Sequence, residues 1–236
     1  MLGLGTGFYK LGGENKSFCS LDRIKPIVMW LNNNKGVSVS GWQDSSNSTT
    51  DHTISQATEG DQAALRSGGL LFVSSEADHY DMANQIAISL QEGFTIMCVV
   101  NLTAHNANQV LLGLNNTNHF FQFNAGGDTL ALKLGTTTTT ITPGDDSSFD
   151  AGSTFMLTVK RDSGATGNIH LYKNGTLLSQ DEQAANTGDA EFITVGTRNA
   201  DRYFNGSLYE LAIWERDLDE HELNDIHHCV KKRFSL

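Results

Sequence analysis

The stretch from Tyr203 to Val230 constrains the fold most, because it combines the signals of a buried strand, a sharp turn and a capped helix. Between Leu208 and Trp214 nearly every residue is apolar on both faces of an alternating strand, and Glu210 is the exception. The pattern therefore predicts a central β-strand that is covered on both faces. Regular alternation would place Leu208, Ala212 and Trp214 on one face and Tyr209, Leu211 and Ile213 on the other.

A short helix is predicted directly after this strand. Asp219 and Glu222 have the D-x-x-E spacing of a capping box, so the helix should begin at about Glu220. Its basic residues lie near the end, where the helix dipole favours cations. We expect the helix to lie on the edge of a sheet. Its apolar stripe consists of Leu223, Ile226, Cys229 and Val230.

The remainder of the chain predicts many short strands separated by polar turns. Gly, Thr, Ser and Asn are abundant and there are only 2 Pro, which suits an all-β chain. Five consecutive threonines favour extended backbone and predict an edge strand, and the Asn174-Gly175 pair predicts a tight hairpin turn. The expected strands lie at about 27–31, 36–42, 68–73, 93–102, 110–114, 119–124, 130–134, 136–141, 154–161, 168–172 and 192–196.

The 236 residues are expected to form one domain preceded by an arm. Residues 1–28 carry closely spaced glycines without sustained periodicity, and residues 29–236 contain no visible linker or repeat. The N-terminus has neither a basic region nor an uninterrupted apolar run, so we expect no secretory signal. No apolar run approaches the length of a membrane span.

Two motifs resemble laminin G-like domains of the concanavalin A-like lectin/glucanase superfamily. Phe204 to Ile213, followed by Trp214 to Asp219, is similar to the F-x-G-x-I-x-E ending of these domains, and residues 157–175 are similar to their v-x-R … l-Y-v-N-G hairpin. The resemblance spans about 29–233. It implies a two-sheet antiparallel β-sandwich, or jelly roll, with a short C-terminal helix. Members bind sugars or proteins, hydrolyse glycans or build surfaces, so the fold alone does not select a function.

The net charge argues against some classes of partner, and the cysteine content argues against a disulfide framework. The net charge of -11 disfavours nucleic acid and anionic membrane surfaces. Three cysteines are an odd number without metal-type spacing, so no disulfide framework is predicted, and Cys98 and Cys229 are interpreted as small buried apolar residues. The glycosylation sequons are interpreted as chance matches in an Asn-rich chain.

The acidic residues after Trp214 match the E-x-D-x-x-E spacing of retaining glucanases. Those enzymes need two carboxylates that converge on a sugar from an extended strand. Here Glu215 and Asp217 fall in the predicted exit turn and Glu220 begins the predicted helix, so we expect them to diverge. We therefore predict no catalytic residues.

No metal site is predicted either. His221, Asp225 and His228 could share one helix face, but the spacing of a zinc-protease helix is absent, and we interpret them as a hydrated surface. Loops that could offer oxygen ligands to Ca²⁺ hold Asp44, Asn47 and Asp51, then Asp78 and Asp81, then Asn124 and Asp128; we interpret these side chains as turn-forming. Cofactors are thus expected to be none, with Ca²⁺ as the alternative. Trp42, Tyr80 and Tyr203 could stack on sugars, although Trp42 is expected in the core.

The favoured hypothesis is a non-catalytic structural or adhesion module on a virion surface. The opening LGLGTG is similar to glycine-rich arms of virion proteins from marine tailed phages, where such arms bind the particle. The partners would be other virion or surface-assembly proteins, with glycans as a further class, and a homo-oligomer is expected. The alternatives are a glycan-binding lectin module, at an extracellular or cell surface, and a glycan hydrolase that uses Glu215 and Glu220.

Overall fold

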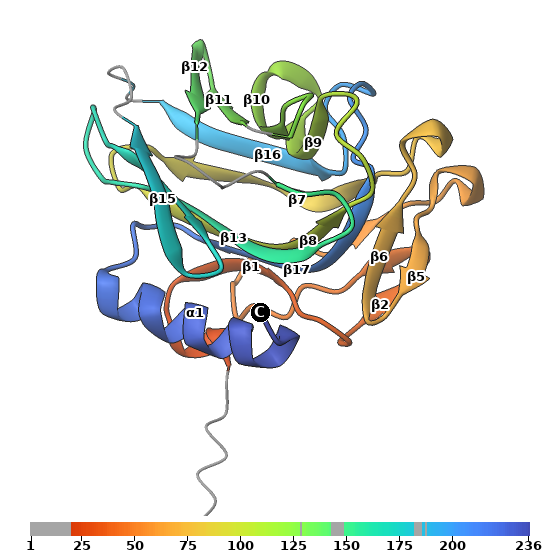
Figure 1. Cartoon of the computed structure of the whole chain (residues 1–236), viewed down its shortest axis with the longest axis horizontal. Helices are drawn as coiled ribbons and strands as arrows, with labels where there is room; N and C mark the ends of the chain where they lie inside the picture. Colours follow the sequence, from red (N-terminus) through yellow and green to blue (C-terminus); the bar gives the residue numbers. More distant parts are fainter. Residues whose placement is uncertain (1–19, 128, 143–148, 182–185, 187) are drawn as a thin grey trace, which may run out of the picture.

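The computed structural model describes residues 20–127, 129–142, 149–181, 186 and 188–236, and the arm residues 1–19 lie outside this part. Two antiparallel sheets pack face to face, and one helix covers the outside of the lower sheet in Figure 1. This architecture confirms the predicted all-β sandwich with a short C-terminal helix.

Sheet A forms the lower layer in Figure 1. Its strands run in the order β15 (Thr176–Asp181), β14 (Ile169–Lys173), β13 (Thr154–Arg161), β8 (Phe94–Leu102), β17 (Gly206–Trp214), β6 (Gly69–Phe72) and β5 (Ala64–Arg66), with β1 (Ile27–Leu31) also beside β17. One edge of β17 pairs first with β6, through residues 206–208, and then with β1, through residues 211–214. Two separate strands therefore share this edge.

Sheet B forms the other layer. Its order is β12 (Thr137–Ile141), β11 (Leu130–Leu134), β10 (Asn116–Phe123), β9 (Gln109–Leu114), β16 (Asp189–Val195), β7 (Tyr80–Ser89), β4 (Ile54–Ser55), β3 (Gly41–Trp42) and β2 (Val37–Ser38). Short 3₁₀ turns lie at η1 (Leu21–Arg23), η2 (Glu59–Asp61) and η3 (Ser74–Glu76). The threonine-rich strand β12 is at the edge of the sheet, as predicted.

The sequence patterns locate most strands but miss the shorter strands β4, β5 and β15 and the long strand β7. Its inward residues are apolar, yet Ala83, Asn84 and Gln85 are exposed in succession and interrupt the alternation. The predicted strand at 36–42 is instead the hairpin of β2 and β3. The turn at Asn174-Gly175 joins β14 to β15, and both residues have positive φ, which confirms the predicted hairpin.

The predicted alternation of β17 is wrong, because a bulge interrupts it. The register against β8 shifts between Leu208 and Glu210, so Tyr209 and Glu210 both lie on the helix side of sheet A. Leu208, Leu211 and Ile213 face the other sheet, and Ala212 and Trp214 face the helix. Both faces of β17 are buried, as expected for a central strand.

Helix α1 (Glu220–Phe234) begins where the capping box predicts. The Asp219 carboxylate accepts the Glu222 N–H at 2.9 Å, and the Glu222 carboxylate accepts the Asp219 N–H at 3.1 Å. The helix lies over the outer face of sheet A rather than on an edge, because its apolar stripe packs against the outward side chains of the central strands. This second core contains Met97, Val99, Met156, Trp214, Leu223, Ile226 and Val230.

Two residues of the helix take part in specific bonds: Arg233 in a buried ion pair and Cys229 in a disulfide. The Glu210 carboxylate, fully buried, accepts two hydrogen bonds from the Arg233 guanidinium at 2.6 Å and one from the Trp30 indole at 2.8 Å. Cys229 is disulfide-bonded, whereas Cys98 is a free, buried thiol. The interpretation of Cys229 as a simple apolar residue is therefore wrong, because its place on the apolar stripe of the helix does not reveal a disulfide bond. Among the described residues, no helix is long and apolar enough to cross a membrane.

Candidate functional site

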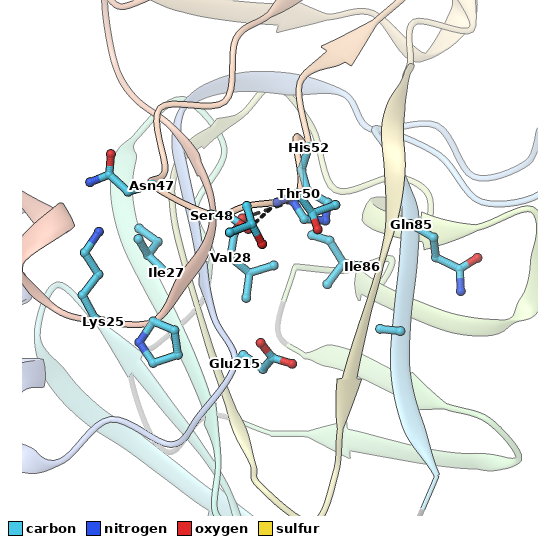
Figure 2. Close-up of a pocket in the computed structure, with 13 residues that line it drawn as sticks. Lys25, Ile27, Val28, Asn47, Ser48, Thr50, His52, Gln85, Ile86 and Glu215 are labelled. Carbon is cyan, nitrogen blue, oxygen red and sulfur yellow. Dashed lines mark hydrogen bonds between the residues drawn. The ribbon is translucent and has the colours of Figure 1, made fainter.

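A cavity of about 480 Å³ lies between residues of β1 in sheet A and β7 in sheet B. It is built from the segment that enters β1, the loop between β3 and β4, the middle of β7 and the turn after β17. These four segments are far apart in the sequence (Figure 2). Its lining residues are Lys25, Pro26, Ile27, Val28, Asn47, Ser48, Thr49, Thr50, His52, Gln85, Ile86, Ala87 and Glu215.

The loop between β3 and β4 is shaped by the buried carboxylate of Asp44. One carboxylate oxygen accepts the Trp30 N–H at 2.9 Å and the Ser46 N–H at 2.8 Å. The other accepts the Ser46 hydroxyl at 2.9 Å and the His52 N–H at 3.2 Å. A carboxylate with four donors acts as a fixed centre for the loop, so the side chains of residues 47–50 are held at the mouth of the cavity.

His52 is buried against the same loop. Its Nδ1 lies 3.1 Å from the carbonyl oxygen of Val28 and 3.8 Å from the nearer Asp44 carboxylate oxygen. A carbonyl only accepts, so Nδ1 carries a hydrogen in this arrangement and Nε2 is the nitrogen left to accept when the ring is neutral. The histidine ring is thereby fixed in orientation at the cavity wall.

The cavity has an aliphatic side and a polar side. Val28 and Ile86 come from opposite sheets and supply the aliphatic surface (Figure 2). Asn47 and Gln85 are exposed at the rim, and the structure gives their side chains no hydrogen bond with another described residue. Amides and hydroxyls beside an aliphatic wall suit a ligand with both hydroxyl groups and C–H surface.

The predicted glucanase carboxylates do not come together. Glu215 lines the cavity, whereas Glu220 lines a separate hollow on the surface of α1. Asp217 accepts the Ser163 N–H at 3.1 Å, and Asp219 caps the helix. The Arg216 guanidinium binds Glu222, with the shorter contact at 2.5 Å, and holds the pKa of Glu222 below its ordinary value. The turn therefore separates the acidic residues, as expected from a strand that ends and a helix that begins.

Two of the three residues that could share one face of α1 contact each other on its exposed surface. His221 and Asp225 lie 3.5 Å from each other on the exposed face of α1, one helical turn apart. Within the described ranges, no group of three or more His, Cys, Asp or Glu side chains is placed to hold a metal ion.

The candidate oxygen-ligand loops have different structures. Asp44 is buried as described above, and the Thr53 hydroxyl and N–H lower the pKa of Asp51. Asp78 is buried and accepts the Val73 N–H at 2.7 Å, while Asp81 is exposed. Burial raises the pKa of Asp78, and its second carboxylate oxygen has no hydrogen-bond partner in the described part of the chain.

The remaining predicted binding residues are dispersed. Asn124 bonds to Gln122 and Thr129, and Asp128 lies outside the described residues. Trp42 is fully buried in the core, as predicted. Tyr80 is also buried there, and its hydroxyl donates to the Val39 carbonyl at 2.7 Å. Burial raises its pKa to about 12. Trp42 and Tyr80 are therefore not available to stack on a sugar.

Sequence reasoning singled out only Asn47 and Glu215 among the cavity residues. Lys25, Val28, His52, Gln85 and their neighbours were missed, because the cavity depends on the pairing of β1 and β7 with other strands. The one local signal is the polar run at 44–53, which shows a shaped loop but not what faces it.

Fold and cavity together define a lectin-like β-sandwich module with a polar recess at its side. The chain belongs to the laminin G-like family of the concanavalin A-like lectin/glucanases superfamily, whose model matches residues 74–224. No curated protein matches the sequence.

Similar solved structures share the fold at low identity. The binding domain of Paraclostridial Mosquitocidal Protein 1 has a TM-score of 0.62 and 17% identity, over 88% of this chain and 52% of that chain. The botulinum neurotoxin serotype C1 binding domain has a TM-score of 0.58 and 16% identity, over the same shares. Trypanosoma rangeli sialidase in complex with sialic acid has a TM-score of 0.58 and 13% identity, over 88% of this chain and 33% of that chain. The chain thus matches a third to a half of the length of these proteins.

Proposed function

We propose that the protein is a non-catalytic binding module that takes a glycan in the cavity beside β1 and β7. The observation that carries this proposal is the composition of the cavity wall, with hydroxyl and amide side chains facing an aliphatic surface. A sugar ring presents the same combination, since its hydroxyls form hydrogen bonds and its C–H faces pack on apolar groups. Membership in a superfamily of lectins and glucanases supports this ligand class.

The non-catalytic part of the proposal rests on how the acidic residues are used. Hydrolysis with retention needs two carboxyl groups about 5 Å apart on either side of the scissile bond. Glu215 is the one carboxylate among the lining residues of this cavity. The other members of the E-x-D-x-x-E run bond to Ser163, cap α1 or lie on its exposed surface.

A binding experiment with paired variants tests the site. Asn47→Ala with Gln85→Ala removes two amides from the rim without breaking a hydrogen bond that the structure gives, so the fold should be retained. A glycan selected on an array should bind this double variant about tenfold more weakly, from the loss of two hydrogen bonds of about 1 kcal/mol or less each. The matched control is Asn106→Ala with Gln180→Ala, two exposed residues elsewhere.

The outcomes of this experiment are distinct. Equal affinity for both double variants would place the ligand elsewhere and refute the cavity as its site. A blank array, with and without Ca²⁺, would refute glycan binding. Release of reducing ends from a bound glycan, abolished by Glu215→Gln, would refute the non-catalytic assignment.

The virion-surface role is a further proposal, based on the glycine-rich opening of the chain. In it the arm of residues 1–28 docks a homo-oligomeric module to the particle, and the cavity faces outward. The described end of the arm packs on the helix side of sheet A through Leu21 and Ile24. Deletion of residues 1–13 should release the protein from its particle and leave the sandwich folded. Sedimentation with the particle measures attachment, and unchanged attachment would contradict the role.

A further inference from the structure

A short loop after β16 folds onto the outer face of sheet B. The loop runs from Thr197 to Arg202, and we call it the arginine loop because it contains Arg198 and Arg202. It crosses β9 at Gly113, where an added methyl group would lie 2.3 Å from the Thr197 carbonyl oxygen. Under it lies an apolar cluster, separate from the main core, formed by Val110, Phe120 and Ala131.

Arg198 is buried, and no carboxylate among the described residues forms an ion pair with it. Only 6% of the residue is exposed, and the guanidinium carbon lies 4.2 Å from the centroid of the Phe120 ring. This cation–π contact stabilises the charge in part. Its Nε has no hydrogen-bond partner, and none of the carboxylates that the structure describes is within 4.0 Å of its guanidinium nitrogens. A buried, unpaired cation of this kind is costly.

The nearest acidic residue is already engaged. The Asp201 carboxylate accepts the Arg202 N–H at 2.8 Å and lies 3.6 Å from the Arg202 Nε. Arg202 brings a second positive charge, and its guanidinium donates to the Gln122 amide oxygen at 2.7 Å. Burial lowers the pKa of Arg198 and the neighbouring charge of Arg202 lowers it further, while the charge of Asp201 acts in the opposite direction. Two cations are thus concentrated on one face of a chain with a net charge of -11.

The backbone of the arginine loop is strained. Asn199, Ala200 and Arg202 have φ of 46°, 50° and 56°, in the left-handed region that non-glycine residues seldom occupy. The Thr194 hydroxyl bonds to the Thr197 carbonyl at 2.6 Å, and the Thr197 hydroxyl bonds to the Asp201 carbonyl at 3.0 Å. Strain that the surroundings maintain in this way is characteristic of functional sites.

We propose that the arginine loop binds the carboxylate of a small ligand on the outer face of sheet B, at a site separate from the cavity. Phe120 covers one face of the Arg198 guanidinium, so the proposed contact with an anion is at the edge of the group. A carboxylate presents two oxygens in one plane and matches the edge of a guanidinium fork. The carboxylate supplies the negative charge that Arg198 lacks. It belongs to an acidic sugar or to a simple organic acid.

Proton–nitrogen NMR of the ¹⁵N-labelled full chain tests the site directly. The buried Arg198 Nε–H should give a resolved signal, assigned by its absence in Arg198→Gln. Sodium glucuronate and sodium acetate should shift this signal, and uncharged methyl glucoside should not. A tighter effect of glucuronate identifies an acidic sugar as the source of the carboxylate, and equal effects identify a simple acid.

Variants of single arginines test how much each contributes to glucuronate affinity. Arg198→Gln should weaken glucuronate binding at least tenfold, because a charge-assisted contact is lost. Arg66→Gln removes an exposed arginine from β5 in sheet A and should leave binding unchanged. The cavity variant with Asn47→Ala and Gln85→Ala should also bind glucuronate normally. Normal glucuronate binding by the cavity variant is expected whether or not the cavity takes a glycan. Failure of one proposal can therefore be distinguished from failure of the other.

Three results would overturn the proposal. They are the absence of any shift with millimolar glucuronate and acetate, equal affinity of the Arg198→Gln protein, and loss of binding in the cavity variant. Should Arg198→Gln not fold, as judged by circular dichroism, Arg202→Gln replaces it, since Arg202 is partly exposed. That variant should weaken binding three- to tenfold, and unchanged binding would refute the site.

Discussion

Charged residues inside this sandwich each have their own set of partners, and the sets differ in strength. Glu210 is compensated by Arg233 and Trp30. Arg161 is fully buried and donates to the carbonyl oxygens of Asp162, Gly164 and Ala165, so it organises a loop. Arg198 has a ring and no described carboxylate. This contrast is why Arg198, and not Arg161, suggests a ligand.

The pair of Glu210 and Arg233 provides a prediction at the residue scale. Arg233→Met leaves a carboxylate that burial already disfavours, as shown by its raised pKa, without its main cation. The free energy of unfolding, measured in urea, should fall by about 3 kcal/mol. Lys232→Met, one residue earlier and exposed, should change it by less than about 0.5 kcal/mol.

A double variant checks the cause. Glu210→Leu with Arg233→Met removes both charges and should recover most of the lost stability, because no buried carboxylate remains. A double variant as unstable as Arg233→Met alone would show that packing of the arginine stem, and not charge, secures the helix.

Among the elements, the approach of the arginine loop to β9 depends on one glycine. Gly113→Ala adds a methyl group against the Thr197 carbonyl and the Arg198 backbone, so the loop must move outward. We expect a loss of about 1–3 kcal/mol in urea unfolding. Gly60→Ala is the control, because an added methyl group there meets nothing within 4 Å. Equal stability of the two variants would show that the loop is not packed as described.

Elements defined by local signals could be predicted, and those defined by distant contacts could not. The capping pair Asp219 and Glu222 lies within one turn of helix, so the start of α1 is readable from the sequence. The bulge at Glu210 depends on the pairing of β17 with β8, and no residue nearby reveals it. The same reason hides the position of α1 on the face of sheet A and the pairing that assembles the cavity.

The whole molecule should lose stability in mild acid through His227. This residue lies between α1 and sheet A, where its Nε2 is 3.1 Å from the Thr158 hydroxyl, and burial lowers its pKa to about 4. An unfolded histidine has a pKa of about 6.5, so between pH 6.5 and 4 the unfolded chain binds more protons. The contribution of His227 to the free energy of unfolding is complete above about pH 6.5, declines as the pH falls and is lost near pH 4. The total loss is up to about 3 kcal/mol.

Unfolding at a series of pH values measures this effect. His227→Gln can keep a hydrogen bond to Thr158 and should flatten the curve between pH 6.5 and 4. His221→Gln, on the exposed face of α1, should leave the curve unchanged. An unaltered slope in the His227→Gln protein would assign the acid sensitivity to other groups.

The shared edge of β17 allows the length of the chain between β1 and β5 to change during evolution. Since β1 and β6 lie end to end along that edge, the chain between Leu31 and Ala64 leaves sheet A and re-enters it at β5 without altering the register of the central strand. The Asn33 amide bridges the junction by donating to the Tyr209 and Gly68 carbonyls. Insertions or deletions in this excursion, which carries the hydroxyl-rich wall of the recess, can reshape recognition while the sandwich stays intact.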